Sequence, residues 1–513
     1  MTRLVHEFLE ESGRRLPEKV CLVHRGTRLT YADVETRANR LAQALKTQGI
    51  ARGDRVGIFL DNSAEAVVAI FAALKAGAAF VPINPTAKRN KLEYLIGNCR
   101  PAALVTHGGK LSTVLPACRG RVPLIIAVDP PPGTPDVIDF AALVDHGPAA
   151  PPESAVIDLD LAAVIYTSSS TGPAKGVMLS HLNMVAAADS ITTYLGSRED
   201  DVILDILPIS FDYGLYQVLM AFRMGATVIL GKPLVFVNEA LDLIESERVT
   251  GFPGVPTIFS LLLGMKDLQR RDFSSLRYIT NTAAALPVPH IRQLREIFPN
   301  VKLFSMYGLT ECKRVSFLPP ELIDQKPDSV GRAMPNEETS IVDEAGDRVA
   351  TQQVGELVVR GSNVMLGYWE LPEESAACLR PGRYPGERVL YTGDLFRMDE
   401  EGDLYFVGRK DDIIKSRGEK VSPREVESVI HGLGGVREVA VVGVPDPVLG
   451  EAVKAFVVLE DGSKLTVEEI LRYCAANLEN VLMPKSVEIG ASFPITPTGK
   501  VDKLELKRRT LSR

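Results

Sequence analysis

The sequence lacks the cysteine and histidine spacings that build metal sites or disulfide frameworks. Its six cysteines contain no C-x-x-C pair, and its seven histidines contain no H-x₃-H or similar pair. Zinc sites and disulfide scaffolds are recognised by such spacings. We therefore expect no structural metal and no disulfides, and the reduced thiols indicate a cytoplasmic protein.

A long apolar run, an excess of basic residues and a secretory leader are lacking as well. No apolar stretch approaches the roughly 18–20 residues that cross a membrane, and residues 1–11 mix both charges. The 58 basic and 65 acidic residues give a formal net charge of −7, which offers no basic footprint for nucleic acid. We expect neither a membrane span nor a nucleic-acid partner.

What the sequence does contain is an alternation of helix and strand patterns. At 513 residues the chain exceeds what one hydrophobic core usually organises, so two or more domains are expected. Helical spacing occurs at residues 35–45, 63–75 and 216–223, and short buried strands are predicted at residues 55–60, 102–105, 202–207 and 226–230. This alternation predicts parallel sheets covered by helices.

The pattern changes towards the C-terminus. From about residue 340 the strands are shorter and separated by glycine turns, as at residues 355–360 and 404–407, which indicates a small β-rich subdomain. After Arg409, strands at 439–442 and 455–459 and a helix at 466–478 form a compact remainder. We predict an α/β protein with a large N-terminal domain (residues 1–409) of two helix-covered, mostly parallel sheets plus this β-rich subdomain. A small α+β C-terminal domain (residues 410–513) follows.

The most informative stretch runs from Tyr166 to Val177. An apolar segment at residues 161–166 precedes it, then five hydroxyl side chains follow at residues 167–171, then Gly172 and Lys175. A buried strand leading into a turn that is rich in donors and closed by a cation is typical of a phosphate-binding loop. It is not a Walker P-loop, because a leading glycine is missing and Gly176 follows the lysine. A solvated turn rich in serine and threonine is the alternative.

The loop resembles the phosphate loop of the adenylate-forming superfamily, whose pattern is Y-T-S-G-S/T-T-G-x-P-K-G-V. Two positions depart from it, Ser169 for a glycine and Ala174 for a proline. Further blocks of the superfamily occur in order at residues 29–33, 74–85, 307–311, 355–361, 391–394, 408–415 and 497–500. On these motifs the chain is identified as a member of the superfamily, which includes acyl-CoA synthetases and the adenylation domains of peptide synthetases.

The resemblance implies a site for ATP and Mg²⁺. Lys500 resembles the family's catalytic lysine, and Glu311 the residue that binds Mg²⁺. Tyr307 is placed against adenine, Asp394 on the ribose hydroxyls and Arg409 on ribose or phosphate. The nucleotide-binding set is Thr167, Ser168, Ser170, Thr171, Gly172, Lys175, Tyr307, Gly308, Thr310, Asp394 and Arg409. A surface lysine, a helix-capping glutamate, a core tyrosine and a turn aspartate are the structural alternatives.

The resemblance also implies a mobile C-terminal domain. Asp411 falls at the family hinge, where this domain rotates between an adenylating and a thioester-forming pose. In the second pose Lys500 leaves and Gly418 approaches, opening a tunnel for a pantetheine thiol. Gly418 could equally be only a turn glycine.

The substrate is indicated by Asp212, which stands where peptide-synthetase adenylation domains have the aspartate that pairs with an amino group. A buried carboxylate needs a partner, so Asp212 favours an amine-bearing acid, unless it caps local backbone N–H groups. By correspondence, Tyr213, Tyr216, Thr282 and Met306 line the same pocket. Lys313 or Arg314 could pair a second carboxylate of the substrate, or the two could form a solvated charge pair.

These residues predict an AMP-forming carboxylate ligase. In the first interpretation it activates an amino acid with ATP and passes it to the pantetheine thiol of a separate carrier protein. In the alternative it is an acyl-CoA ligase for a non-amino acid, since residues 414–427 resemble that version and Lys415, Arg417 and Lys420 could contact CoA phosphates. A non-catalytic nucleotide-binding module is disfavoured by the presence of Lys500 and Glu311.

Overall fold

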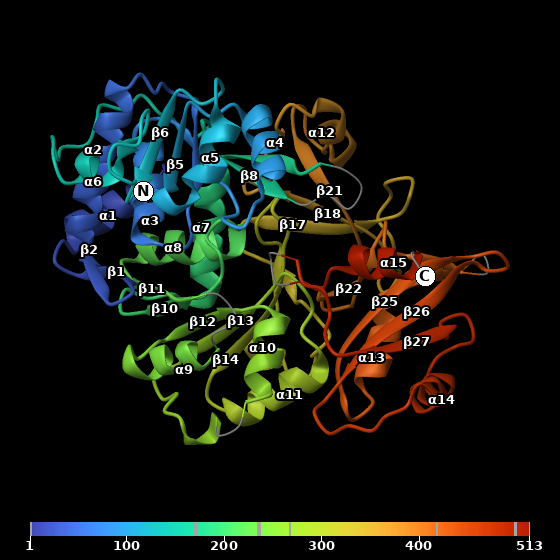
Figure 1. The fold of residues 1–513 in the computed structure, drawn as a ribbon. Coiled ribbons are helices and arrows are strands. Elements are labelled where there is room, and N and C mark those ends of the chain that lie inside the picture. Colours follow the sequence, from blue (N-terminus) through green and yellow to red (C-terminus); the bar gives the residue numbers. More distant parts are fainter. Residues whose placement is uncertain are drawn as a thin grey trace.

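The protein, seen in a computed structural model, forms a large N-terminal part and a smaller C-terminal domain at its side (Figure 1). The structure describes residues 3–167, 173–232, 237–265, 268–416, 419–496 and 500–511. The N-terminal part contains two large sheets and a smaller one, and the C-terminal domain contains its own sheet.

The first large sheet has eight strands, and those from β8 to β7 are parallel to their neighbours. In spatial order they are β19 (Gly367–Tyr368), β9 (Lys175–Ser180), β8 (Leu161–Thr167), β4 (Ala79–Pro82), β3 (Arg55–Phe59), β5 (Ala103–His107), β6 (Leu124–Val128) and β7 (Ile138–Asp139). β9 runs antiparallel to both β8 and β19. The phosphate-loop residues therefore connect two neighbouring strands of this sheet.

The second large sheet has nine strands with a parallel centre. In order they are β16 (Arg332–Ala333), β15 (Ser316–Phe317), β14 (Lys302–Tyr307), β13 (Tyr278–Asn281), β12 (Gly251–Gly254), β10 (Val202–Asp205), β11 (Thr227–Leu230), β1 (Val20–His24) and β2 (Thr27–Thr30). The strands at its two edges are antiparallel. The prediction of two mostly parallel sheets is confirmed.

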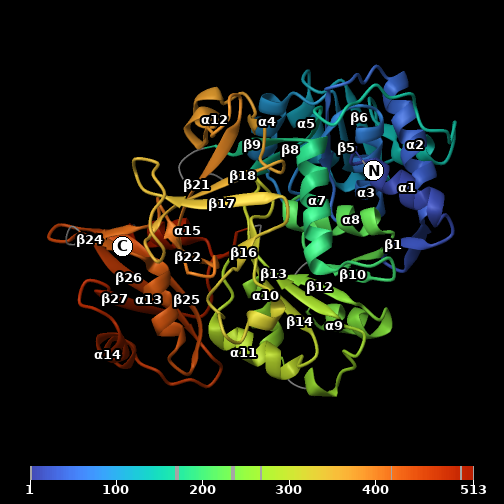
Figure 2. The same cartoon turned by 180° about the vertical axis from the view of Figure 1, so that it is seen from behind.

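Helices pack between and around these sheets (Figure 2). α3 (Ala64–Lys75) buries every residue except Glu65, because the others are apolar apart from Lys75, whose ammonium pairs with Glu10 and Glu35. It packs against α2 (Tyr31–Thr47), while α8 (Asp212–Met224) packs against α1 (Glu7–Arg15) and α7 (His181–Leu195). The others are α4 (Arg89–Cys99), α5 (Leu111–Cys118), α6 (Phe140–Val144), α9 (Val237–Ser246), α10 (Pro256–Leu263), α11 (Val288–Ile297) and α12 (Pro372–Cys378). One continuous core cluster joins residues from both sheets.

The β-rich subdomain is an antiparallel sheet. Its strands are β17 (Glu337–Val342), β18 (Gly355–Gly361), β21 (Arg388–Met398) and β20 (Leu379–Pro381), with β22 (Leu404–Arg409) paired to β21. This confirms the β-rich subdomain, but the expectation of shorter strands is wrong, since β21 has 11 residues whereas β3 has 5 and β4 has 4.

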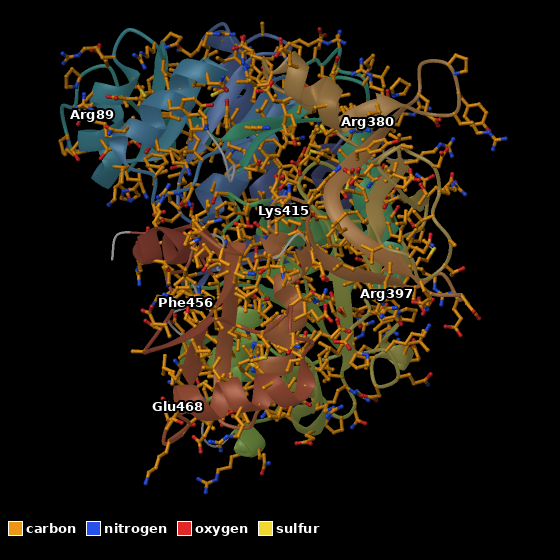
Figure 3. The ribbon with its side chains drawn as sticks, turned by 90° about the vertical axis from the view of Figure 1, so that its right-hand side faces the viewer. Arg89, Arg380, Arg397, Lys415, Phe456 and Glu468 are labelled. Carbon is orange, nitrogen blue, oxygen red and sulfur yellow. The ribbon has the colours of Figure 1, made fainter. Side chains whose placement is uncertain are left out.

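The C-terminal domain has a five-stranded sheet with helices and a hydrophobic core of its own. Its elements are β23 (Ile414–Ser416), β24 (Glu419–Val421), α13 (Pro423–His431), β25 (Val436–Asp446), β26 (Gly450–Leu459), α14 (Val467–Asn477), β27 (Ser486–Gly490) and α15 (Lys503–Leu511). In Figure 3, Lys415 on β23 lies at the end of the domain nearer the N-terminal sheets, and Glu468 on α14 at the other end. The boundary at residues 409–410 falls between β22 and β23, and we keep it as a proposal.

No helix in the described residues is both long and apolar enough to cross a membrane. All six cysteines are free, and five of them are buried.

Candidate active site

Lys500 lies at a turn of the C-terminal domain that points towards the N-terminal part. Its backbone N–H donates to Oγ1 of Thr496 at 3.1 Å, and the backbone N–H of Thr496 donates to the carbonyl of Lys500 at 2.7 Å. The pKa of Lys500 is lowered because surrounding protein displaces water from the ammonium, and the carboxylates of Asp212, Asp394 and Glu311 oppose this effect. The structure thus brings Lys500 within electrostatic reach of three carboxylates from distant parts of the chain.

Glu311 is held by an aromatic residue that the sequence did not single out. The hydroxyl of Tyr368 donates to Oε1 of Glu311 at 2.7 Å, and the Nζ atom of Lys175 lies 5.1 Å from the centroid of the Tyr368 ring. β19, which carries Tyr368, pairs with β9, which begins at Lys175. In the described part of the chain, Oε2 of Glu311 has no hydrogen-bond partner. A hard oxygen left open in this way fits a Mg²⁺ ligand.

Asp394 is fixed between Tyr307 and Arg409. The hydroxyl of Tyr307 donates to Oδ2 of Asp394 at 2.5 Å, and Nε of Arg409 lies 3.2 Å from Oδ1. Asp394 and Arg409 are direct partners across β21 and β22. Burial raises the pKa of Asp394, and Arg409 partly offsets it. These are the contacts expected of a carboxylate kept in one orientation to accept hydrogen bonds from a ribose.

The Tyr307 ring packs against other aromatic rings. Its centroid lies 4.8 Å from that of Phe396, edge to face, and 6.2 Å from that of Phe406, stacked. An adenine could therefore stack only on the face of Tyr307 that Phe406 leaves open.

The loop after Tyr307 turns back on itself because Gly308 allows a close approach. A Cβ atom at Gly308 would lie 2.4 Å from the carbonyl oxygen of Lys313 and 2.9 Å from Cα of Arg314. Lys313 itself has a left-handed backbone (φ 68°). As a result Lys313 and Arg314 are each only 2% exposed, so the solvated charge pair considered above is wrong.

Lys313 pairs with Asp212, the first residue of α8. Its Nζ atom lies 3.1 Å from Oδ2 of Asp212 and 3.9 Å from the centroid of the Tyr216 ring. Burial lowers the pKa of Lys313 to about 7, and Asp212 opposes the shift. Burial acts to raise the pKa of Asp212, but Lys313 and Arg314 outweigh it, so that pKa is lowered. In the described residues Asp212 does not cap backbone N–H groups, and its carboxylate already has a cationic partner.

Arg314 lies among aromatic side chains of α7 and α8. Its guanidinium carbon is 5.2 Å from the centroid of the Tyr213 ring, and it is close enough to Tyr194 to act on the pKa of that phenol. Tyr194 also donates to Sδ of Met306 at 3.0 Å. Thr282, after β13, is 3% exposed, and its Oγ1 has no hydrogen-bond partner. We call Asp212, Tyr213, Tyr216, Lys313 and Arg314 the acid-site cluster.

Several predicted site residues are not part of these contacts. Ser168, Ser170, Thr171, Gly172 and Gly418 lie outside the described residues. Thr167 lies at the end of β8, and Thr310 lies next to Glu311. Asp411 lies in an exposed turn after β22, next to Lys410, whose backbone N–H donates to the carbonyl of Gly393 at 2.8 Å.

Two further residues of the site, Tyr368 and Tyr194, were not predicted from the sequence. Tyr368 follows a glycine and precedes Trp369, so an aromatic pair after a glycine turn was the available signal. Tyr194 lies within α7 and had no local signal, because only the tertiary fold brings it to Arg314.

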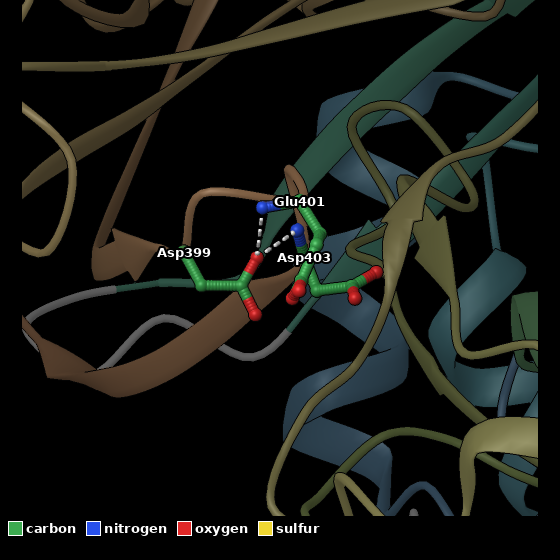
Figure 4. A group of neighbouring side chains, drawn as sticks. All are labelled: Asp399, Glu401 and Asp403. Atoms are coloured by element: carbon green, nitrogen blue, oxygen red, sulfur yellow. Dashed lines mark hydrogen bonds between the residues drawn. The ribbon is translucent and has the colours of Figure 1, made fainter.

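A group of three carboxylates elsewhere is close enough to hold a metal ion: Asp399, Glu401 and Asp403 (Figure 4). The ammonium of Lys326 already lies among them, 2.7 Å from Asp399 and 2.6 Å from Asp403, and it also pairs with Glu401. This cluster is a structural ion-pair network that closes the hairpin between β21 and β22.

A small C-terminal domain that extends a lysine towards the carboxylates of a large parallel-sheet domain defines the adenylate-forming class of enzymes. Comparison with known proteins agrees. The family model "AMP-binding enzyme" matches residues 9–369, and the model "AMP-binding enzyme C-terminal domain" matches residues 425–500. The chain therefore belongs to the AMP-binding enzyme family and is an ATP-dependent, AMP-forming ligase.

Its relatives cover nearly the whole chain. It is 32% identical over 544 aligned residues to a long-chain-fatty-acid–CoA ligase of Bacillus subtilis (strain 168), covering 99% of this chain and 94% of the relative. It is 33% identical to a feruloyl-CoA synthase of an Amycolatopsis species, covering 97% of each. Among solved structures, ATP-bound MatB from Rhodopseudomonas palustris has a TM-score of 0.89 at 28% identity, covering 98% of each chain. The anthranilate CoA ligase AuaEII, in complex with anthranoyl-AMP, has a TM-score of 0.90 at 27% identity, covering 99% of this chain and 98% of that one.

Proposed function

We propose that the protein is an acyl-CoA ligase, which activates a carboxylic acid with ATP and transfers the acyl group from its adenylate to the thiol of CoA. The observation that carries the proposal is Lys500, which comes from the far end of the chain to within electrostatic reach of Glu311 and Asp394. Attack of a carboxylate on the α-phosphorus increases negative charge on the phosphoryl oxygens and the departing pyrophosphate. A positioned ammonium stabilises that charge.

The other site residues divide the remaining work. Glu311 would hold Mg²⁺ through Oε2, and the ion would supply charge neutralisation on the phosphates. Asp394 and Arg409 orient the ribose, and Lys175 supplies a second cation at the end of the phosphate loop. Asp411 would be the hinge about which the C-terminal domain turns for the thioester step, with Gly418 at the thiol tunnel. The free cysteines support a cytoplasmic location.

CoA is favoured over a carrier protein, and a non-amino acid over an amino acid, by two observations. The relatives described above are named as CoA ligases or synthases. In addition, the carboxylate that an amino group would need, Asp212, is paired with Lys313 at 3.1 Å. The amino acid and the carrier protein of our first interpretation therefore lose their main argument.

The test measures products with ATP, Mg²⁺ and a panel of acids. We expect AMP and an acyl-CoA to form together, and Lys500→Ala to lose roughly 10²–10³ in the rate of adenylate formation. Lys503→Ala is the matched control, because Lys503 pairs with Glu427 at 2.6 Å within the C-terminal domain. Unchanged adenylate formation in Lys500→Ala would contradict the catalytic role. Product found only on a phosphopantetheinylated carrier, with none on CoA, would restore the carrier-protein interpretation.

A further inference from the structure

Arg314 is a buried cation that has no carboxylate partner in the described part of the chain. It is 2% exposed, and its Nε has no hydrogen-bond partner. Its neighbours, Tyr213 and Tyr194, are themselves buried, and burial raises the pKa of both phenols, so they are neutral at physiological pH. Desolvating an ion without a counter-ion costs several kcal/mol. An anion that binds beside Arg314 would offset that cost.

The nearby acidic groups do not supply this anion. Asp212 is paired with Lys313. Glu337 lies close enough to Tyr194 to influence its pKa, but in the described residues it forms no ion pair with Arg314, and burial raises the pKa of this carboxyl. Its Oε2 accepts a hydrogen bond from Nδ2 of Asn363 at 2.7 Å. With Lys313 protonated, the acid-site cluster holds two cations and one carboxylate, a net charge of one positive unit.

The cluster also lies close to the reacting centre. Lys500 and Arg314 both lower the pKa of Asp212, so its carboxylate lies within electrostatic reach of each of them. The site thus has one cation where the acid is activated and a second cation at Arg314. An acid that carries a carboxylate at each end matches these two charges.

The side chains around the cluster fit a short, polar acid better than a long aliphatic tail. Tyr213, Tyr216 and Met306 are buried, and the centroid of the Tyr213 ring lies 5.2 Å from the guanidinium carbon of Arg314. Hydroxyls of Ser210 and Thr282 are buried without hydrogen-bond partners. A long methylene chain beside Arg314 would lie against a desolvated guanidinium, which is unfavourable.

We propose that Arg314 binds a distal carboxylate of the substrate, so that the acid taken by this ligase is a short dicarboxylic acid. This inference rests on the proposed acyl-CoA ligase function. It makes Arg314 a specificity-determining residue, and it makes Lys313 a positioning residue that keeps Asp212 from competing for Arg314.

The test compares dicarboxylic acids with monocarboxylic acids of the same chain length, measuring AMP release in the presence of CoA. Glutarate, adipate and pimelate are paired with pentanoate, hexanoate and heptanoate. We expect kcat/KM of the wild type for the best dicarboxylate to exceed that of its partner by roughly 10- to 100-fold, the value of a charge-assisted hydrogen bond. Wild-type preference for the monocarboxylates overturns the inference.

The variant Arg314→Met keeps length and removes charge. We expect KM for the dicarboxylate to rise by roughly 10- to 100-fold with kcat little changed, while KM for the monocarboxylate stays or falls. Arg314→Lys should recover part of the dicarboxylate preference. Arg332→Met, which removes a half-exposed arginine paired with Asp403, is the control and should change neither KM. An equal loss on both acid series in Arg314→Met indicates a merely structural arginine and overturns the inference.

The results also separate this inference from the proposed function. AMP release with monocarboxylates alone keeps the ligase and overturns the distal carboxylate. If no acid of either series supports AMP release, the proposed ligase function is overturned, and this inference is overturned with it. Where Arg314→Met does not fold, the wild-type comparison and Arg314→Lys decide.

Discussion

Single residues show where the sequence was informative and where it was not. Lys500, Glu311, Asp394 and Arg409 stand in motifs, so their proximity could be predicted before the fold was known. The partners of Lys313 and Arg314 could not be predicted, because their burial depends on a close backbone contact at Gly308 and on a left-handed residue. Two adjacent charges are normally solvated, and only a non-local constraint overrides that tendency.

Gly308→Ala tests this constraint. A Cβ atom 2.4 Å from the carbonyl oxygen of Lys313 forces the loop outwards, which should cost about 1–3 kcal/mol in the free energy of unfolding. It should also raise KM for the acid, because Lys313 and Arg314 move with the loop. Urea unfolding and steady-state kinetics measure the two effects.

Gly434→Ala is the matched control, since a Cβ atom there meets nothing within 4 Å. It should leave both quantities unchanged. A Gly308→Ala variant with wild-type stability and KM would show that the loop has room to adjust, and the argument from close contact would be wrong.

At the level of helices and strands, apolar periodicity was sufficient for most of the elements. α3, β3, β10 and α14 lie where the patterns placed them, within a few residues. α8 begins at Asp212, four residues before the predicted helix, because its first residues are also compatible with a turn. The two-residue strand β19 was not predicted, since a segment so short has no periodicity, and with it Tyr368 was missed.

Tyr368→Phe tests what β19 contributes. Losing the hydroxyl that donates to Glu311 at 2.7 Å should reduce the rate of adenylate formation by roughly 5- to 30-fold and raise the Mg²⁺ concentration needed for half-maximal activity. Removing a hydrogen bond from a carboxylate leaves Glu311 less well oriented. Titration of activity with Mg²⁺ gives the measurement.

Tyr405→Phe serves as the control for Tyr368→Phe. Tyr405 also donates its hydroxyl to a carboxylate, Oδ2 of Asp399 at 3.1 Å, in the ion-pair network of Figure 4. We expect its Mg²⁺ dependence to match that of the wild type. If both variants shift the Mg²⁺ requirement equally, Tyr368 has no specific role at Glu311.

On the scale of the whole molecule, the sequence predicted two helix-covered sheets and a small second domain, but not how that domain sits. The contact between α11 and α13 shows one part of the interface: the rings of His290 and His431 lie 6.1 Å apart, edge to face. The pKa of each is lowered to about 4, by burial at His431 and by burial together with the nearby His431 at His290. Histidine spacing along the chain could not reveal this pair.

The histidine pair predicts a pH-dependent interface. Both pKa values are lower in the packed state than the usual 6.5, so the separated state binds more protons between pH 6.5 and about 4. The packed interface is fully stable above pH 6.5 and loses stability as the pH falls, by about 2 kcal/mol for each histidine at pH 5. Limited proteolysis of the segment after β22 should therefore be faster at pH 5 than at pH 7.

Replacement of one histidine checks the cause. His290→Phe keeps a ring at the contact but removes the proton site, so the difference in cleavage rate between pH 5 and pH 7 should shrink. His107→Phe, at a half-exposed histidine of β5, should keep the wild-type difference. A His290→Phe protein with the wild-type pH dependence would assign the effect to other groups.

The separate core of the C-terminal domain has a mechanical consequence. The two large sheets share one hydrophobic interior around α3, whereas the domain that carries Lys500 is filled by its own clusters of side chains. A rotation of this domain leaves these interiors closed and breaks contacts between the two parts, such as the contact between His290 and His431. The domain rotation that we propose for the thioester step would therefore require less energy than a motion that separates the two large sheets.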